Sequence, residues 1–337
     1  PCVGATYCVD RIYQAGDALC MHNAATGREL TMPHEIPKAA KTKKIVIVGA
    51  GPAGLEAARV AAERGHSVTL FEAQPHAGGQ IRLTALNPRR REMISIIDWR
   101  VAQCEKHGVE FRFNSWAEVD DVTALNPDVV IIATGGLPNT ELFETRGDAK
   151  NVVTSWDIIA GDVKPAENIL VYDESGDHPG LQAAEVAALA GSKVEVMTPD
   201  RVFAPDIMAM NLVPYMRVLQ DKDVTFTVTR RLLDVQKNGN KLKAIIGTDY
   251  SDHTHEADYD QVVINYGTLP LDELYFGLKP FSSNEGAVDH DALIDGRVQS
   301  ISRNSEGAFQ LFRIGDAVSA RNTHAAIYDA LRLMKDI

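Results

Sequence analysis

The chain has 337 residues, 45% apolar and 24% charged, with a formal net charge of −12 at pH 7. This acidity argues against nucleic acid or an anionic membrane surface as a partner. No run of 18 apolar residues exists that could cross a membrane, so we expect a cytoplasmic protein. The length suits two domains plus an appendage.

Residues 1–40 contain three of the four cysteines but show little periodicity. Cys2, Cys8 and Cys20 follow the spacing C-x5-C-x11-C. Thiolates grouped in this way are typical of an iron–sulfur centre. The fourth, Cys104, lies in a predicted helix and is expected to pack in a core. The stretch "TMPHEIPKAAKTKK" reads as a linker, because it combines two prolines with a basic cluster.

From residue 43 the sequence predicts a strand, a glycine turn, an alanine-rich helix and a second strand. In the turn, "GAGPAG", the first glycine permits a tight bend, the second lets a pyrophosphate approach, and the third lets helix and strand pack closely. Glu72 ends the second strand and suits the adenosine ribose of FAD or ADP, but not the 2′-phosphate of NADP. The candidate binding residues here are Gly49, Gly51, Pro52, Ala53, Gly54 and Glu72.

Three later glycine-containing pieces follow predicted strands and are expected near the same ligand. They are "HAGGQIR", "ATGG" and "IGDA". The candidate residues in them are Gly79, Gln80, Thr134, Gly135, Gly315 and Asp316.

A second strand–turn–helix–strand unit begins near Asn168, but its turn reads "YDESGDHPG" and lacks the glycine fingerprint. Asp173, Glu174 and Asp177 would oppose an anionic ligand. Pro179 has no amide hydrogen to donate. We therefore expect that this unit does not bind NAD(P)H.

The order of these motifs resembles glutathione-reductase-like flavoproteins. That resemblance implies an α/β fold with two Rossmann-like three-layer nucleotide-binding domains, one inserted in the other, after an N-terminal iron–sulfur-type loop segment. The expected parts are residues 1–40 for the cysteine segment and linker, 41–145 with 268–337 for the split ADP- or FAD-binding domain, and 146–267 for the inserted degenerate domain.

The cysteine spacing and the split module together resemble the trimethylamine dehydrogenase and 2,4-dienoyl-CoA reductase family, most of all its dimethylglycine and N-methylproline demethylase branch. The family pattern is C-x2-C-x2-C, then about a dozen residues, then C, and Ala5 stands at its second cysteine. Three thiolates could hold a [3Fe–4S] cluster or a [4Fe–4S] cluster with a further ligand, or the segment could be vestigial. A zinc site with His22 or His34 is disfavoured by the context.

The resemblance also implies an N-terminal FMN-bearing barrel, so a chain that starts at Pro1 is expected to be a carboxyl-terminal piece of a homo-oligomer. Three functions stay open. The first is the electron-handling part of an amine dehydrogenase or N-demethylase, which passes electrons to an external acceptor such as an electron-transferring flavoprotein. The second is an NADPH-dependent dienoyl-CoA reductase-type flavoprotein, and the third a non-catalytic ADP-binding module. No residue is expected to act as a catalytic acid, base or nucleophile.

Overall fold

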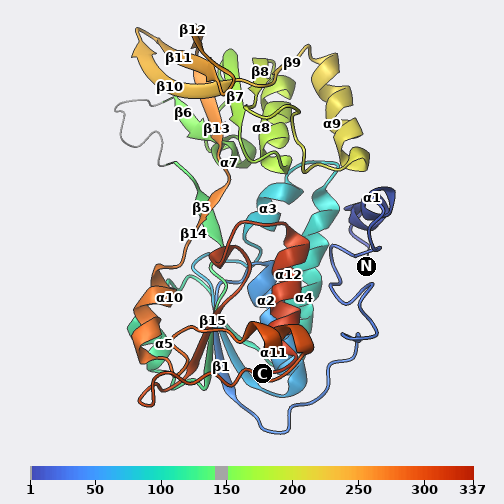
Figure 1. The fold of residues 1–337 in the computed structure, drawn as a ribbon, viewed down its shortest axis with the longest axis vertical. Coiled ribbons are helices and arrows are strands. Elements are labelled where there is room, and N and C mark those ends of the chain that lie inside the picture. Colours follow the sequence, from blue (N-terminus) through green and yellow to red (C-terminus); the bar gives the residue numbers. More distant parts are fainter. Residues whose placement is uncertain (1, 141–150) are drawn as a thin grey trace. The chain divides into compact units, whose positions relative to one another are not determined.

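The computed structural model describes residues 2–140 and 151–337, which are drawn in Figure 1. It divides the chain into two compact units, Pro1–Leu137 with Leu269–Ile337, and Pro138–Thr268. The cysteine segment therefore belongs to the first unit. The boundary predicted between residues 145 and 146 lies outside the described residues. The return to the first unit falls between Thr268 and Leu269, one residue after the predicted position.

The first unit is built on a parallel five-stranded sheet in the order β15-β4-β1-β2-β3. Its strands are β1 (Lys44–Val48), β2 (Ser67–Phe71), β3 (Glu110–Arg112), β4 (Val129–Ile132) and β15 (Gln310–Arg313). Alternate residues of β1 enter different cores, because successive side chains of a strand point to opposite faces. Ile45 and Ile47 pack on one side, and Val46 and Val48 on the other. Helices therefore cover both faces, as in a doubly wound fold.

The glycine turn leads into α2 (Pro52–Arg64), which lies beside α4 (Ser95–Lys106) and α12 (Thr323–Met334) (Figure 1). Small alanine side chains on α2 are almost all buried and allow this close approach. On the other face, α5 (Val119–Thr123) and α10 (Glu273–Leu278) contribute Val122, Tyr275 and Leu278 to the second core. The remaining short helices of the unit are α3 (Gln80–Ala85), η1 (Arg91–Ile94), η2 (Lys279–Phe281), α11 (His290–Asp295) and η3 (Gly315–Ala317).

The cysteine segment packs on this unit instead of extending from it. It contains the short helix α1 (Tyr7–Tyr13), and its Val3, Ala24 and Ala25 are buried in the same core as α2. The ring Nδ1 of His324, on α12, lies 2.8 Å from the Cys20 carbonyl oxygen. The segment is thus part of the folded unit.

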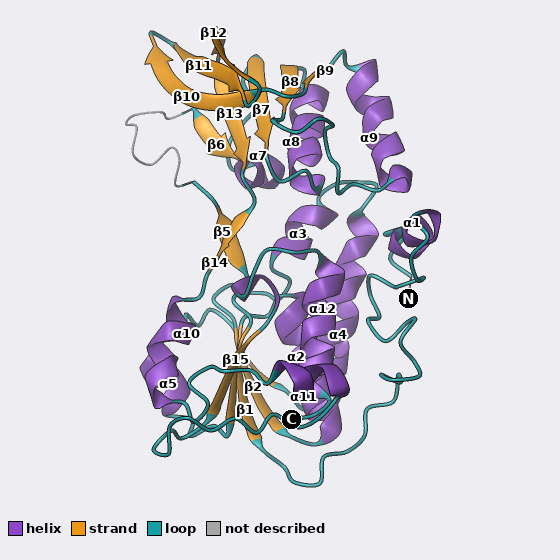
Figure 2. Ribbon diagram, viewed as in Figure 1, coloured by secondary structure: helices purple, strands orange, loops and turns teal. Residues whose placement is uncertain are grey.

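The second unit has its own parallel sheet, β6-β13-β7-β8-β9, and an antiparallel sheet, β10-β11-β12 (Figure 2). Its strands are β6 (Val152–Thr154), β7 (Asn168–Asp173), β8 (Lys193–Met197), β9 (Thr225–Thr227), β10 (Arg231–Asn238), β11 (Lys241–Thr248), β12 (Ser251–Tyr259) and β13 (Gln261–Asn265). Its helices are α7 (Ser155–Ala160), α8 (His178–Leu189) and α9 (Ala209–Asp221). The stretch "NGNK" forms the hairpin turn between β10 and β11, in which Asn238 pairs with Lys241 and Gly239 has a φ of 62°.

The chain passes between the units through β5 (Gly136–Pro138) and β14 (Thr268–Pro270), which pair with each other. The predicted α/β class with parallel sheets is confirmed. Across residues 2–140 and 151–337, every helix is too short or too polar to span a bilayer.

Candidate functional site

The turn between β1 and α2 has the geometry that its three glycines predict. Gly49 has a φ of 103°, and a Cβ added there would lie 2.4 Å from the Ala133 carbonyl oxygen. A Cβ on Gly54 would lie 1.8 Å from the carbonyl oxygen of Gly49. A Cβ on Gly51, by contrast, would meet no atom within 4 Å. The outer glycines are therefore required by packing, and the middle one leaves the backbone accessible to an anion at the start of α2.

Glu72, after the end of β2, connects that strand end to the glycine turn. Its Oε2 accepts a 2.8 Å hydrogen bond from the Ala50 amide, and its Oε1 accepts a 2.9 Å bond from the Gln74 amide. Both bonds fix the carboxylate beside the turn. A carboxylate held there can also accept hydrogen bonds from ribose hydroxyl groups.

A cavity of about 270 Å³ opens beside Glu72, within the first unit. Its wall is mainly apolar and includes the indole of Trp116, which is 65% exposed. The carboxylates of Glu72, Glu118 and Glu273 also line the cavity. It therefore suits a planar ring without negative charge better than an anionic ligand. Lining residues that no sequence motif indicated include Ser115, Trp116, Ala117, Glu118 and Val119.

The loop before α3 and the turn after β15 meet beside the glycine turn. Gln80 Nε2 donates to Asp316 Oδ2 at 3.1 Å. A Cβ on Gly79 would lie 3.4 Å from the Gly51 Cα, and one on Gly315 would lie 3.0 Å from the Cβ of Ala53. Burial raises the pKa of Asp316, although hydrogen bonds from the Arg321 amide and Gln80 oppose that rise. The structure thus brings residues 79–80 and 315–316 to the start of α2.

Thr134 and Gly135 follow β4 and are tied to the returning chain. The Thr134 hydroxyl donates to the Leu271 carbonyl oxygen, and the Leu271 amide donates to the Gly135 carbonyl oxygen at 3.0 Å. Thr134 also lines the cavity. Thr134 and Gly135 are therefore bonded to the chain that returns to the first unit, and the Thr134 amide nitrogen also lies 3.0 Å from the position of a Cβ on Gly49.

The three cysteines predicted to bind metal are not gathered in this structure. Cys2 and Cys8 are exposed and Cys20 is half-buried. Over residues 2–140 and 151–337, no group of three His, Cys, Asp or Glu side chains is placed to hold a metal ion. This arrangement does not fit an iron–sulfur cluster. Cys104 is buried in α4, as predicted for a core residue, and burial raises the pKa of its thiol to about 12.

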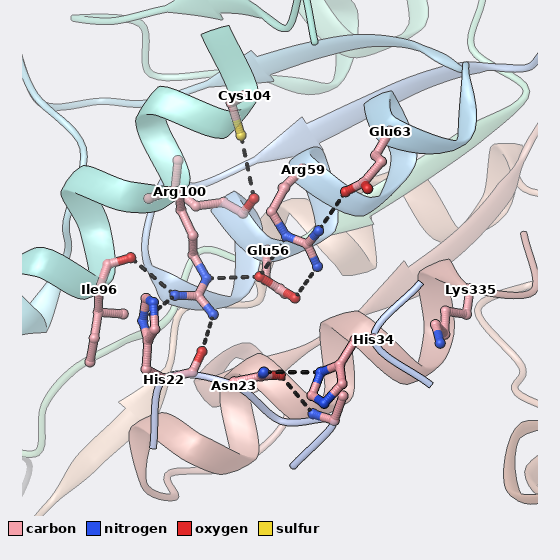
Figure 3. A network of polar contacts seen from close by, with 12 residues as sticks. His22, Asn23, His34, Glu56, Arg59, Glu63, Ile96, Arg100, Cys104 and Lys335 are labelled. Carbon is pink, nitrogen blue, oxygen red and sulfur yellow. Dashed lines mark hydrogen bonds and ion pairs between the residues drawn. The ribbon is translucent and has the colours of Figure 1, made fainter. Parts of the chain in front are cut away.

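A buried network of charged side chains links α2, the helix after the glycine turn, to the cysteine segment (Figure 3). Arg100 on α4 is 1% exposed and donates to Glu56 Oε2, on α2, at 2.8 Å. It also donates to the carbonyl oxygen of His22 at 2.7 Å, and its Nη1 lies 3.2 Å from His22 Nδ1. Arg59 donates to the other oxygen of Glu56 at 2.7 Å. Four side chains from three segments are thus joined in one core.

Burial and these charges shift the pKa values of the network. Burial, followed by the guanidinium of Arg100, lowers the pKa of His22 to about 4. Burial alone would raise the pKa of Glu56, but Arg100 and Arg59 lower it below its ordinary value. His22 is therefore neutral and Glu56 ionised at pH 7.

Known proteins similar to this chain are oxidoreductases. A family profile described as "Pyridine nucleotide-disulphide oxidoreductase" matches residues 43–330. The probable N-methylproline demethylase of Rhizobium meliloti is 67% identical over 337 residues, which are 100% of this chain and 49% of that relative. The N,N-dimethylglycine/sarcosine dehydrogenase of Chromohalobacter salexigens is 41% identical over 99% of this chain and 50% of its own length.

Among solved structures, 2-naphthoyl-CoA reductase in complex with 2-naphthoyl-CoA matches with a TM-score of 0.80 and 27% identity, over 100% of this chain and 46% of that one. The chain therefore spans about half the length of the curated relatives it matches. These relatives confirm the predicted resemblance to the demethylase branch.

Proposed function

Because the chain belongs to the pyridine nucleotide-disulphide oxidoreductase family, we propose that it is the nucleotide-binding, electron-transfer part of an FMN-dependent N-demethylase or amine dehydrogenase for secondary or tertiary methylamines. The observation that carries this proposal is the 67% identity to the probable N-methylproline demethylase over every residue of the chain. Because the match covers the whole of this chain, it includes the cysteine segment and both units.

In this proposal the first unit binds the ADP moiety of FAD, or ADP itself. The open face at Gly51 and the start of α2 would receive the pyrophosphate, and Glu72 the ribose. The apolar cavity beside Trp116 would receive the adenine. A flavin, when bound, supplies one- and two-electron chemistry, while the residues of this chain bind and orient it.

The remaining parts of the proposal lie outside this chain. An FMN-bearing barrel of the same protein would oxidise the amine, and an external protein such as an electron-transferring flavoprotein would accept the electrons. We place the protein in the cytoplasm as a homo-oligomer. An iron–sulfur centre at Cys2, Cys8 and Cys20 stays a prediction. No electron-transfer step is assigned to it, because the arrangement of these cysteines in the described residues does not fit such a centre.

A second candidate is a reductase of the dienoyl-CoA type, in which NADPH would deliver a hydride to FAD. The likeness to 2-naphthoyl-CoA reductase favours it. The missing glycine fingerprint at residues 172–180 disfavours it, because this function needs a working second nucleotide site. The non-catalytic ADP-binding module is compatible with the first proposal, if ADP and not FAD occupies the first unit.

The test is a comparison of electron donors on the full-length protein. N-methylproline, dimethylglycine and sarcosine are each supplied anaerobically, and flavin bleaching is followed; NADH and NADPH are supplied in parallel. Bleaching by a methylated amine and not by NAD(P)H is expected. Bleaching by NAD(P)H alone would favour the second candidate. Extraction of the cofactors then identifies FMN, FAD or ADP.

A further inference from the structure

In the inserted unit, the amides of the turn from β7 to α8 already have a carboxyl partner from their own chain. At the equivalent turn of a dinucleotide-binding domain, backbone amides donate to the phosphate oxygens. Here the amides of Ser175 and Gly176 donate to Asp173 Oδ1, at 3.0 and 3.1 Å. Asp173 ends β7 and is 1% exposed.

Side chains complete the enclosure of this carboxyl group. Asn265, the neighbour of Asp173 on the adjacent strand β13, donates from Nδ2 to Asp173 Oδ1 at 2.8 Å. The Ser175 hydroxyl donates to the same oxygen at 3.3 Å. Asn265 is itself held by Ser155, whose hydroxyl donates to Asn265 Oδ1 at 2.9 Å. Four donors thus converge on one oxygen.

The other carboxyl oxygen occupies the space beside the glycine of the following helix. A Cβ on Gly180 would lie 2.5 Å from Asp173 Oδ2, so only glycine fits against this carboxyl group. Burial raises the pKa of Asp173, while the hydrogen bonds to Oδ1 oppose that rise.

The other two acidic residues of the turn have different roles. Glu174 accepts from the Tyr172 hydroxyl at 2.7 Å and from Arg231 at 2.6 Å. Asp177 is the N-cap of α8 and accepts from the His178 amide at 2.6 Å. Among the described contacts, the carboxyl group that accepts the turn amides of Ser175 and Gly176 is that of Asp173.

We propose that Asp173 determines the ligand specificity of the inserted unit, because its carboxyl group occupies the hydrogen-bond donors that the pyrophosphate of a dinucleotide would need. A pyrophosphate could bind only by displacing a group with four donors, and would leave that group buried without them. This goes beyond the proposed function, which requires no dinucleotide in this unit but does not identify the residue responsible.

The test uses the full-length protein with its first nucleotide site filled, titrated calorimetrically with inorganic pyrophosphate and with NADH. The wild type should bind neither. Asp173→Gly should bind both, with a dissociation constant at least about tenfold below the highest concentration at which the wild type shows no binding, the scale for freeing buried donors. Asp177→Asn is the matched control, because it removes one negative charge from the same turn but keeps a capping side chain. It should gain much less affinity than Asp173→Gly, because the donors to Asp173 Oδ1 stay occupied.

Several results would overturn the proposal. The first is that the wild type binds as tightly as Asp173→Gly, and the second is that a folded Asp173→Gly does not bind. The third is an equal gain of affinity in Asp177→Asn, because such a gain would assign the effect to charge alone. If Asp173→Gly does not fold, hydrogen exchange of the wild type decides. The amides of Ser175 and Gly176 should exchange slowly and be unaffected by pyrophosphate; fast exchange would refute the proposal. Neither readout involves amine oxidation. Failure of the proposal about Asp173 is therefore distinguishable from failure of the proposed function.

Discussion

The side-chain amide of Gln80 lies 3.1 Å from the carboxylate of Asp316, a residue 236 positions later in the chain. Gln80 opens α3, and Asp316 follows the last strand of the sheet. Their hydrogen bond joins, beside the glycine turn, the two separate parts of the chain that make up the first unit. Both segments must fold together before this part of the site exists.

Replacing Gln80 should therefore weaken nucleotide binding without altering the glycine turn. In Gln80→Ala the half-buried Asp316 loses a donor, and we expect about 1 kcal/mol weaker binding of ADP or FAD. Nucleotide retained after dialysis measures the effect. Gln74→Ala is the control, because the Gln74 backbone amide still donates to Glu72. Equal losses in both variants would contradict the assignment.

Glu72 should contribute more, since it contacts the turn and faces the cavity. Glu72→Ala removes the acceptor of the Ala50 amide and the expected ribose partner, so adenosine nucleotides should bind roughly 1–3 kcal/mol more weakly. Glu72→Gln keeps one oxygen and should lie between this variant and the wild type. Fluorescence titration of stripped protein with ADP gives the affinities, and unchanged nucleotide content in purified Glu72→Ala would refute the role.

The parts of this site that the sequence predicts are those encoded locally. A strand, three glycines, a helix and an acid eighteen residues beyond Gly54 lie in one short stretch, and each has a single physical reason. Trp116 is not indicated by the sequence, because it reaches the cavity from a loop without a motif, and Glu273 reaches it from the start of the short helix α10. The buried position of Arg100 is not predicted for another reason. Its partner His22 lies 78 residues away, and a charged residue in a helix is normally expected at the surface.

The Arg100 network should dominate the attachment of the cysteine segment. Arg100→Met leaves Glu56 buried with one guanidinium fewer and frees the carbonyl of His22, so the free energy of unfolding should fall by about 3–5 kcal/mol. Urea unfolding measures this. Arg91→Ala, which removes an exposed pair with Glu92, should cost at most about 1 kcal/mol. If limited proteolysis cleaves residues 1–40 no faster in Arg100→Met, the network does not hold the segment.

Acid should weaken the same attachment through His22. Its pKa is about 4 in the folded protein and 6.5 when unfolded, so the unfolded state binds the proton first as the pH falls. The stabilisation is complete above pH 6.5 and is lost between pH 6.5 and 4, by about 3 kcal/mol at most.

His66 has the same shift, also caused first by burial, and contributes with the same sign. In His22→Asn, whose side-chain oxygen can replace Nδ1 as an acceptor, the loss of stability over this pH range should shrink by roughly half. Urea midpoints at pH 7, 5.5 and 4.5 measure the slope. A slope equal to that of the wild type would show that His22 does not titrate in this way.

The four cysteines should differ in reactivity according to their burial. Thiolates are the reactive form, so exposed Cys2 and Cys8 should be alkylated by iodoacetamide in the native protein, and Cys20 more slowly. Cys104 should react only after unfolding, because it is buried and its pKa is raised to about 12. Mass spectrometry of anaerobically prepared protein, with and without an iron chelator, gives the order. Protection of Cys2, Cys8 and Cys20 together, lost when iron is removed, would contradict the described arrangement and show that the segment rearranges around a metal centre. Cys104→Ser should leave the iron content unchanged in either case, since its side chain is enclosed by the core of another part of the unit.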